Sequence, residues 1–187
     1  HRIARRQRQM CIRDSFSTNH SKIFNRIYDY AVTTGLTPSP FECWLAERGL
    51  NTFEIRFHKC QENAEKLAVW LQKRPEVINV IYPKLNNHPD KKTFKTLFNG
   101  NSCNMVSFEL RGNRSVANKF AKNAHQISFA PTLGDVGTTL SHPASSSHRS
   151  LSKAQRKKMG ITEGFFRVSV GLEDIEDLKN EFKKGLK

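Results

Sequence analysis

One arginine lies in an otherwise apolar stretch near the C-terminal end of the chain. Arg167 stands between Phe166 and Val168 in the run Phe165-Phe166-Arg167-Val168-Ser169-Val170-Gly171. A permanently charged guanidinium in an apolar strand needs an anionic partner, and its paired N–H donors match the two oxygens of a carboxylate. The partner is therefore either the carboxylate of a bound small molecule or an acidic side chain of the protein itself.

A long segment without a clear helix or strand pattern precedes this arginine. Residues 131–149 hold two glycines and two prolines and are expected to form a loop. Loops this long within a compact domain are usually functional or disordered. His142 and His148 within the segment are interpreted as structural loop histidines, which are commoner than catalytic ones.

The four cysteines lie at positions 11, 43, 60 and 103, and their wide, irregular spacing matches neither a zinc site nor a disulfide framework. We expect free thiols in a reducing compartment and no metal site. No apolar run approaches the roughly 20 residues needed to span a bilayer. The N-terminus also lacks the apolar stretch of a secretory signal. These features predict a soluble, cytoplasmic protein without membrane contact.

The first fifteen residues resemble translated adapter DNA. Residues 5–15 agree residue by residue with a read-through translation of a common transposon-based sequencing adapter. We therefore expect residues 1–15 to be an artefact and the true N-terminal sequence to be missing. The alternative is a basic arm that binds nucleic acid. The segment holds five Arg and one Asp, so the net charge of +14 falls to +10 without it.

Helices and strands alternate along the rest of the chain, which predicts an α/β or α+β class. Apolar residues at steps of three and four predict a long helix over residues 41–73, with a bend at Gly49 and a stop at Pro75. Further helices are predicted over 21–30, within 84–104, over 116–124, from 152 to near 160, and from 173 or 174 onward. Apolar, β-branched runs predict strands over 77–82, 105–110, 127–130 and 166–170.

A series of short motifs runs in order from about residue 16 to the C-terminus. The motifs are Ser39-Pro40-Phe41, Arg48-Gly49-Leu50-Asn51-Thr52, Gln61-Glu62-Asn63-Ala64-Glu65-Lys66-Leu67-Ala68, Val80-Ile81-Tyr82-Pro83-Lys84-Leu85, Met105-Val106-Ser107-Phe108-Glu109-Leu110, Thr132-Leu133-Gly134-Asp135-Val136, His142-Pro143-Ala144-Ser145-Ser146-Ser147-His148 and Arg167-Val168-Ser169-Val170-Gly171-Leu172-Glu173-Asp174. Together they resemble the transsulfuration family, the pyridoxal-phosphate (PLP) enzymes of cysteine and methionine metabolism that include cystathionine gamma-synthases and gamma-lyases. Each motif is weak alone, whereas the ordered set is specific.

The resemblance implies that the chain is the C-terminal part of a longer fold-type I PLP enzyme. Residues 16–40 would then end the PLP-binding large domain, 41–75 would form a long interdomain helix, and 76–187 would form the small domain. That small domain is expected to be an α+β unit with a mostly antiparallel four-stranded sheet and helices packed on one side. The cofactor would be PLP, bound mainly by the missing upstream part, and the complete enzyme would be a homotetramer.

The resemblance also implies substrate-binding roles for three side chains. Arg167 matches the arginine that binds the substrate carboxylate, Thr132 matches a serine near that carboxylate, and Ser147 lies on a loop that approaches the active site. No residue here is assigned as catalytic or cofactor-binding, because the Schiff-base lysine lies upstream of the segment that is resembled. Lys22 is interpreted instead as an exposed helix lysine.

Several positions depart from the family pattern. Pro131 and Gly137 stand where glutamates are frequent, and both positions touch the substrate channel of the enzymes that the chain resembles. Cys60 stands where a histidine is common, and Cys103 and Asn104 replace a pair of glycines. The first two departures leave open which sulfur amino acid or acylhomoserine is used. Cys60 lies on the apolar face of its helix, so a packing role is expected.

The predicted activity of the complete enzyme is γ-replacement, or β- or γ-elimination at a C–S bond, with a sulfur amino acid or an O-acylhomoserine as substrate. The fragment alone is predicted to be inactive because it lacks the Schiff-base lysine. Two alternatives stay open: a basic nucleic-acid-binding module and a non-catalytic paralogue. The basic residues form small scattered clusters, such as Arg156-Lys157-Lys158, without interleaved aromatics. That pattern favours a solvated surface over a nucleic-acid interface.

Overall fold

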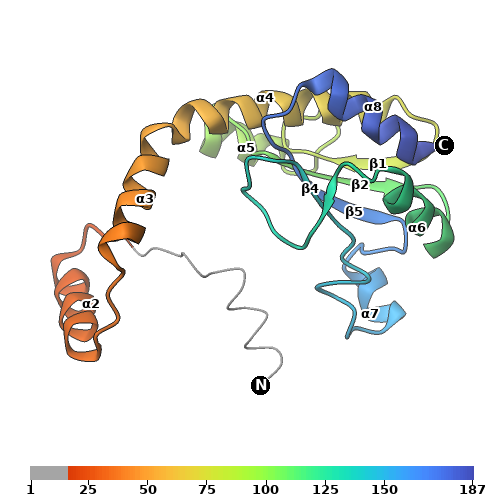
Figure 1. Ribbon diagram of the computed structural model, residues 1–187. Helices are drawn as coiled ribbons and strands as arrows, with labels where there is room; N and C mark the ends of the chain where they lie inside the picture. The colour runs from red at the N-terminus through yellow and green to blue at the C-terminus, as the bar shows by residue number, and fades with distance from the viewer. Residues whose placement is uncertain (1–16) are drawn as a thin grey trace. The chain divides into compact units, whose positions relative to one another are not determined.

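The computed structural model describes residues 17–187 (Figure 1). The chain separates into two compact units, residues 1–53 and 54–187. The segment predicted to derive from adapter DNA, residues 1–15, lies outside the described residues. No helix among the described residues is both long and apolar enough to cross a membrane.

The described part of the first unit consists of two helices, α2 (Ser21–Thr34) and α3 (Pro40–Asn51). α2 ends at Gly35, whose φ of 69° lies in the left-handed region that glycine adopts without a steric cost. α3 begins with a capping box, in which the Ser39 hydroxyl accepts the backbone N–H of Glu42 at 3.3 Å. Neither helix buries a residue, so their apolar side chains remain accessible.

The long helix predicted over residues 41–73 is instead two helices. α3 ends at Asn51, the backbone of Thr52 (φ −116°, ψ 6°) leaves the helical region, and α4 (Phe53–Gln72) begins directly after Thr52. Asn51 and Thr52 are both weak helix formers. The break therefore falls there and not at Gly49, which lies inside α3.

The second unit is built on a five-stranded sheet with the strand order β1-β2-β5-β4-β3. Its strands are β1 (Val77–Ile81), β2 (Met105–Leu110), β3 (Ser128–Phe129), β4 (Thr139–Ser141) and β5 (Phe165–Ser169). Neighbouring strands are antiparallel except for β3 and β4, which are parallel. The prediction of four strands was wrong, because β4 forms in the segment that was expected to be a loop. A strand of three residues is too short to show the alternation by which strands are recognised.

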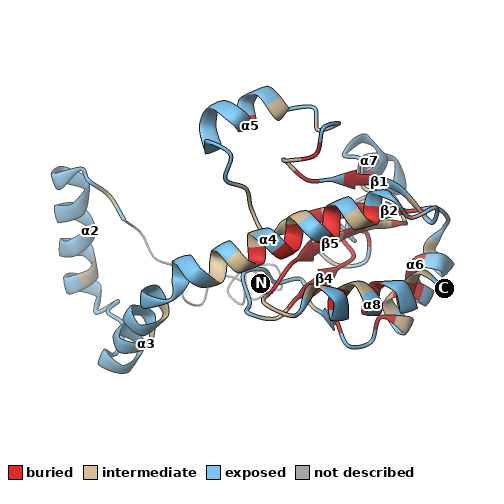
Figure 2. Cartoon of the chain, turned by 90° about the horizontal axis from the view of Figure 1, so that it is seen from above, coloured by how far each residue is buried: buried red, intermediate tan, exposed pale blue. Residues whose placement is uncertain are grey.

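One face of the sheet packs against helices. Along β2, Val106, Phe108 and Leu110 are buried while the residues between them are half-buried. The helices α4, α6 (Arg114–Asn123) and α8 (Ile175–Leu186) bury apolar side chains in the same core, as Figure 2 shows for α4 and α8. Contacting phenylalanine rings at its centre have centroids 5.1 to 5.8 Å apart, and these rings belong to Phe108, Phe120, Phe166 and Phe182. The prediction of helices on one side holds for these three.

The opposite face of the sheet carries Ser107, Glu109 and Arg167 beside the apolar Met105 and Phe165, and it is called the polar face below. The short helix α7 (Lys153–Lys158) lies on the side of the sheet away from α4 and α8 (Figure 1). It begins with the predicted capping box, in which the Ser152 hydroxyl accepts the Gln155 N–H at 3.2 Å. The remaining helix, α5 (Lys91–Phe98), lies between β1 and β2 in the chain.

Candidate functional site

Arg167 lies on the polar face of the sheet. Phe166 and Val168 are buried in the core, so the alternation of a strand turns Arg167 to the other side. In the register of the sheet Arg167 pairs with Ser107 of β2 and with Ser141 of β4. These three residues form a row across the sheet, on the face opposite Phe166 and Val168.

The Arg167 guanidinium has no acidic partner within residues 17–187. Its Nη2 donates a hydrogen bond to the backbone carbonyl of Thr132 at 3.4 Å, which is long for such a bond. Glu109 lies on the same face of the neighbouring strand, but its carboxylate accepts the Thr162 hydroxyl at 2.5 Å. Within residues 17–187, therefore, Arg167 makes a hydrogen bond to a backbone carbonyl and forms no internal salt bridge.

Thr132 meets Arg167 through its backbone and not through its hydroxyl. Its carbonyl accepts from Arg167 and also from the Thr139 hydroxyl at 3.2 Å. Thr132 itself is exposed, and its hydroxyl makes no hydrogen bond to another residue of the described chain. The structure therefore brings Thr132 and Arg167 together and leaves the Thr132 hydroxyl available to a ligand.

Ser147 has a different hydrogen-bond partner. Its hydroxyl is exposed and hydrogen-bonded to Nδ1 of the neighbouring His148 at 2.8 Å. Between residues 17 and 187, Ser147 makes no hydrogen bond to Arg167 or to Thr132. Its substrate-binding role stays a prediction.

His142 has a structural role in the same segment. It is buried, and its Nε2 lies 2.9 Å from the Glu163 carbonyl while its Nδ1 lies 2.8 Å from the Ser145 hydroxyl. Because a carbonyl can only accept, the hydrogen of the neutral ring lies on Nε2. Burial lowers the pKa of His142, which keeps the ring neutral.

The segment before β4 is anchored to the end of β5. The Thr138 hydroxyl donates to Glu173 Oε2 at 2.8 Å and accepts the Gly171 N–H at 2.9 Å, and the Thr138 N–H also donates to the Glu173 carboxylate. Asn63, buried on α4, donates to the carbonyls of Gly171 (3.0 Å) and Glu173 (2.8 Å). The sequence interpretation missed this anchor, because it placed Glu173 at the start of the last helix and gave it no contact with residues 131–149.

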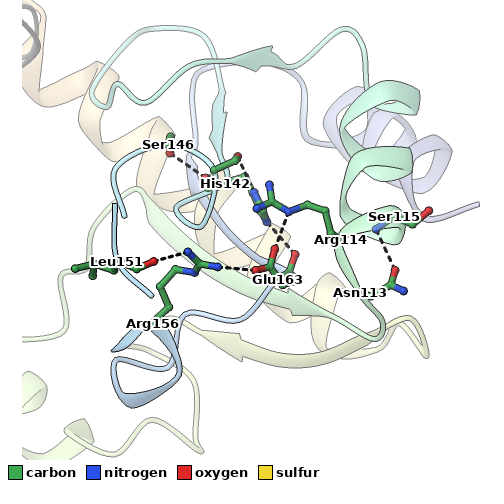
Figure 3. A network of polar contacts seen from close by, with 9 residues as sticks. Asn113, Arg114, Ser115, His142, Ser146, Leu151, Arg156 and Glu163 are labelled. Atoms are coloured by element: carbon green, nitrogen blue, oxygen red, sulfur yellow. Dashed lines mark hydrogen bonds and ion pairs between the residues drawn. The ribbon is translucent and has the colours of Figure 1, made fainter. Parts of the chain in front are cut away.

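Glu163 joins three segments of the second unit (Figure 3). Its carboxylate accepts from Arg114 Nε of α6 at 2.6 Å and from Arg156 Nη2 of α7 at 2.8 Å. Partial burial alone would raise the pKa of Glu163, but the hydrogen bonds from the two arginines outweigh it and lower that pKa. Arg156 is only 8% exposed, so the prediction of a solvated Arg156-Lys157-Lys158 cluster was wrong for its first member.

The cysteines of the described chain are free thiols. Cys60 is buried, and this burial, with the nearby charge of Glu173, raises the pKa of its thiol and makes it a weaker nucleophile. Cys43 is exposed and Cys103 is half-buried, while Cys11 lies outside the described residues. Residues 17–187 contain no group of three or more His, Cys, Asp or Glu side chains that could hold a metal ion.

A family model described as Cys/Met metabolism PLP-dependent enzyme matches residues 13–187. The chain belongs to this family. The resemblance of the motifs from Ser39-Pro40-Phe41 to Arg167-Val168-Ser169 is thereby confirmed. Residues 1–12, which form most of the segment predicted to derive from adapter DNA, lie outside the match.

The matches to individual relatives extend over most of this chain but over less than half of each relative. The cystathionine beta-lyase of Bacillus subtilis (strain 168) is 41% identical over 146 residues, which are 78% of this chain and 37% of that protein. The O-succinylhomoserine sulfhydrylase of Pseudomonas aeruginosa is 39% identical over 154 residues, which are 82% of this chain and 38% of that protein. The crystal structure of cystathionine gamma synthase from Xanthomonas oryzae pv. oryzae, in complex with aminoacrylate and cysteine, matches with a TM-score of 0.80 and 32% identity over 90% of this chain and 43% of that chain. The chain thus spans about two fifths of the length of these relatives.

Proposed function

We propose that this chain is the C-terminal, substrate-facing part of a PLP-dependent transsulfuration enzyme of the cystathionine gamma-synthase or gamma-lyase type. The complete enzyme performs γ-replacement or β- or γ-elimination on a sulfur amino acid or an O-acylhomoserine. The observation that carries the proposal is the state of Arg167. It is a half-buried guanidinium on the polar face of the sheet, without an acidic partner among residues 17–187.

The names of the relatives support the substrate class. They include a lyase and a synthase of cystathionine and a sulfhydrylase of O-succinylhomoserine. Both cystathionine and O-succinylhomoserine are amino acids with an α-carboxylate, which a single well-placed guanidinium can bind. These substrates differ in the sulfur-containing or acyl group that leaves. The α-carboxylate that Arg167 would bind is common to them.

Arg167 binds the substrate α-carboxylate with paired N–H donors and thereby fixes the orientation of the bond that breaks. The Thr132 carbonyl holds one side of the guanidinium at 3.4 Å, so the remaining N–H groups are available to the carboxylate. In this proposal the Thr132 hydroxyl contacts the substrate beside Arg167, and Ser147 contacts it from its own part of the loop at residues 131–149. When bound, PLP supplies an electron sink for the negative charge that develops on the substrate.

The described residues fit the carboxylate of the substrate, and none is assigned to PLP itself. A guanidinium without an acid beside it, on a polar sheet face, is the donor set that a carboxylate requires. The Schiff-base lysine and the groups that hold the cofactor belong, in this proposal, to the part of the relatives that this chain does not span. The chain alone is therefore inactive, and the homotetrameric complete enzyme turns over substrate.

Product analysis on the complete enzyme tests the proposal. The gene is first sequenced again, so that the missing N-terminal part is included. The substrates are cystathionine, methionine and an O-acylated homoserine, each assayed with and without added PLP. PLP-dependent loss or exchange of the sulfur or acyl group supports the proposal. A complete enzyme that binds PLP and converts none of the three is a non-catalytic paralogue, which would overturn it. As a control, PLP added to the 187-residue chain should give no stable absorbance that responds to these substrates.

A further inference from the structure

The segment with Thr132 and the strand with Arg167 are held together at two points. Arg167 Nη2 donates to the Thr132 carbonyl at 3.4 Å. Two residues further along each segment, the Gly134 N–H donates to Ser169 Oγ at 3.0 Å. Arg167 and Ser169 share one face of β5, as residues two apart in a strand do. The place of the Thr132 carbonyl, and of the guanidinium that contacts it, therefore depends on the Ser169 hydroxyl.

Asn104 fixes that hydroxyl from the start of β2. Its Nδ2 donates to Ser169 Oγ and to the Val170 carbonyl, both at 3.2 Å, so both amide hydrogens are used. The backbone carbonyl of Asn104 accepts the Val170 N–H at 2.9 Å. Ser169 is 1% exposed, and its oxygen accepts from both Asn104 and Gly134. These two bonds use both lone pairs of the hydroxyl oxygen.

We propose that Asn104 is a positioning residue for Arg167 and acts through Ser169 and Gly134. A residue without a side-chain amide at this position could make neither of the two Nδ2 bonds. The inference rests on the proposed function, because the position of Arg167 affects activity only when Arg167 binds substrate.

Hydrogen exchange of the 187-residue chain, followed by NMR, tests the contact itself. In Asn104→Ala the Gly134 amide should exchange about tenfold faster than in the wild type, because its acceptor is no longer held. Ser169→Ala removes the acceptor and should accelerate the same amide at least as much. Asn101→Ala is the matched control, since Asn101 is exposed in the same segment and its side chain makes no hydrogen bond to the described residues. Protected amides along β2 verify folding, and unchanged exchange at Gly134 in Asn104→Ala overturns the proposal.

Steady-state kinetics of the complete holoenzyme test the consequence. Asn104→Ala should raise KM for the amino-acid substrate about five- to tenfold and change kcat by less than about twofold, as expected when substrate binding is weakened uniformly. A variant that only loosens the fold would lower the amount of active enzyme and leave KM unchanged. Faster exchange at Gly134 together with an unchanged KM overturns the positioning role. The proposed function fails separately, when Arg167→Ala itself leaves kcat/KM unchanged.

Discussion

The Thr138 hydroxyl donates to the Glu173 carboxylate at 2.8 Å and at the same time accepts the Gly171 N–H at 2.9 Å. Thr138 is only 4% exposed, so a methyl in place of its hydroxyl leaves a buried N–H and a carboxylate oxygen without a partner. Thr138→Val is expected to lower the free energy of unfolding by about 1–3 kcal/mol. Urea unfolding of the chain measures this change, with Thr93→Val on the exposed surface of α5 as control. Equal stabilities of the two variants would contradict the anchor.

Glu163 should make the stability of the chain depend on pH. Partial burial opposes ionisation, but the hydrogen bonds from Arg114 and Arg156 lower the pKa of Glu163 below its usual 4.5. Its contribution is therefore fully present above that value and is lost as the pH falls through the lowered pKa. Glu163→Gln should lower the free energy of unfolding by about 1–3 kcal/mol at neutral pH and by progressively less in acid.

Unfolding of the wild type and Glu163→Gln at a series of pH values tests this window. Glu62→Gln is the control, because Glu62 lies in an exposed pair with Lys66 and contributes little. A difference between wild type and Glu163→Gln that stays constant from neutral pH to well below 4.5 would show that ionised Glu163 is not what joins α6 and α7.

Helices and strands could be predicted from the sequence where the pattern of their own residues, such as apolar alternation or a capping box, indicates them. β2 forms over the predicted residues 105–110, because Val106, Phe108 and Leu110 alternate with less apolar side chains. The start of α7 was predicted from the spacing of Ser152 and Gln155, which are close enough to cap each other.

Features that depend on contacts between distant residues could not be predicted. β4 is too short for a periodic signal, and its pairing with β5 decides that it is a strand. Arg156 looked like one member of a solvated basic cluster, because no residue near it in the sequence indicates that it forms an ion pair with Glu163. At the candidate site, the charge of Arg167 within an apolar strand was visible, whereas the approach of the Thr132 carbonyl requires the fold.

The nucleic-acid alternative has its own test. Without residues 1–15 the net charge is still +10, and Lys157 and Lys158 are exposed on α7. We expect the affinity for duplex DNA to be no tighter than the nonspecific range of roughly 10⁻⁴–10⁻⁶ M at physiological salt. Fluorescence anisotropy at several salt concentrations measures it, with Lys157→Ala plus Lys158→Ala for comparison. Nanomolar affinity with a preference for one sequence would favour the alternative.

The central claim is that Arg167 binds the substrate α-carboxylate, and Arg167→Ala in the complete enzyme tests it. Losing one partner of such a charge pair costs about 2–4 kcal/mol, so kcat/KM should fall roughly 30- to 1000-fold. Arg111→Ala is the matched control, because Arg111 also donates a single 3.4 Å bond to a backbone carbonyl, that of Pro75, but lies beyond the end of β2. Its kcat/KM should equal that of the wild type.

The most direct measurement compares the amino-acid substrate with its carboxamide, which has no carboxylate charge, in the wild type and in Arg167→Ala. Because removal of either partner breaks the same interaction, the two losses should not add. We expect the wild type to prefer the acid strongly and Arg167→Ala to show almost no preference, while Arg111→Ala keeps the wild-type preference. A full preference for the acid in Arg167→Ala would contradict the role of Arg167 as the carboxylate-binding residue.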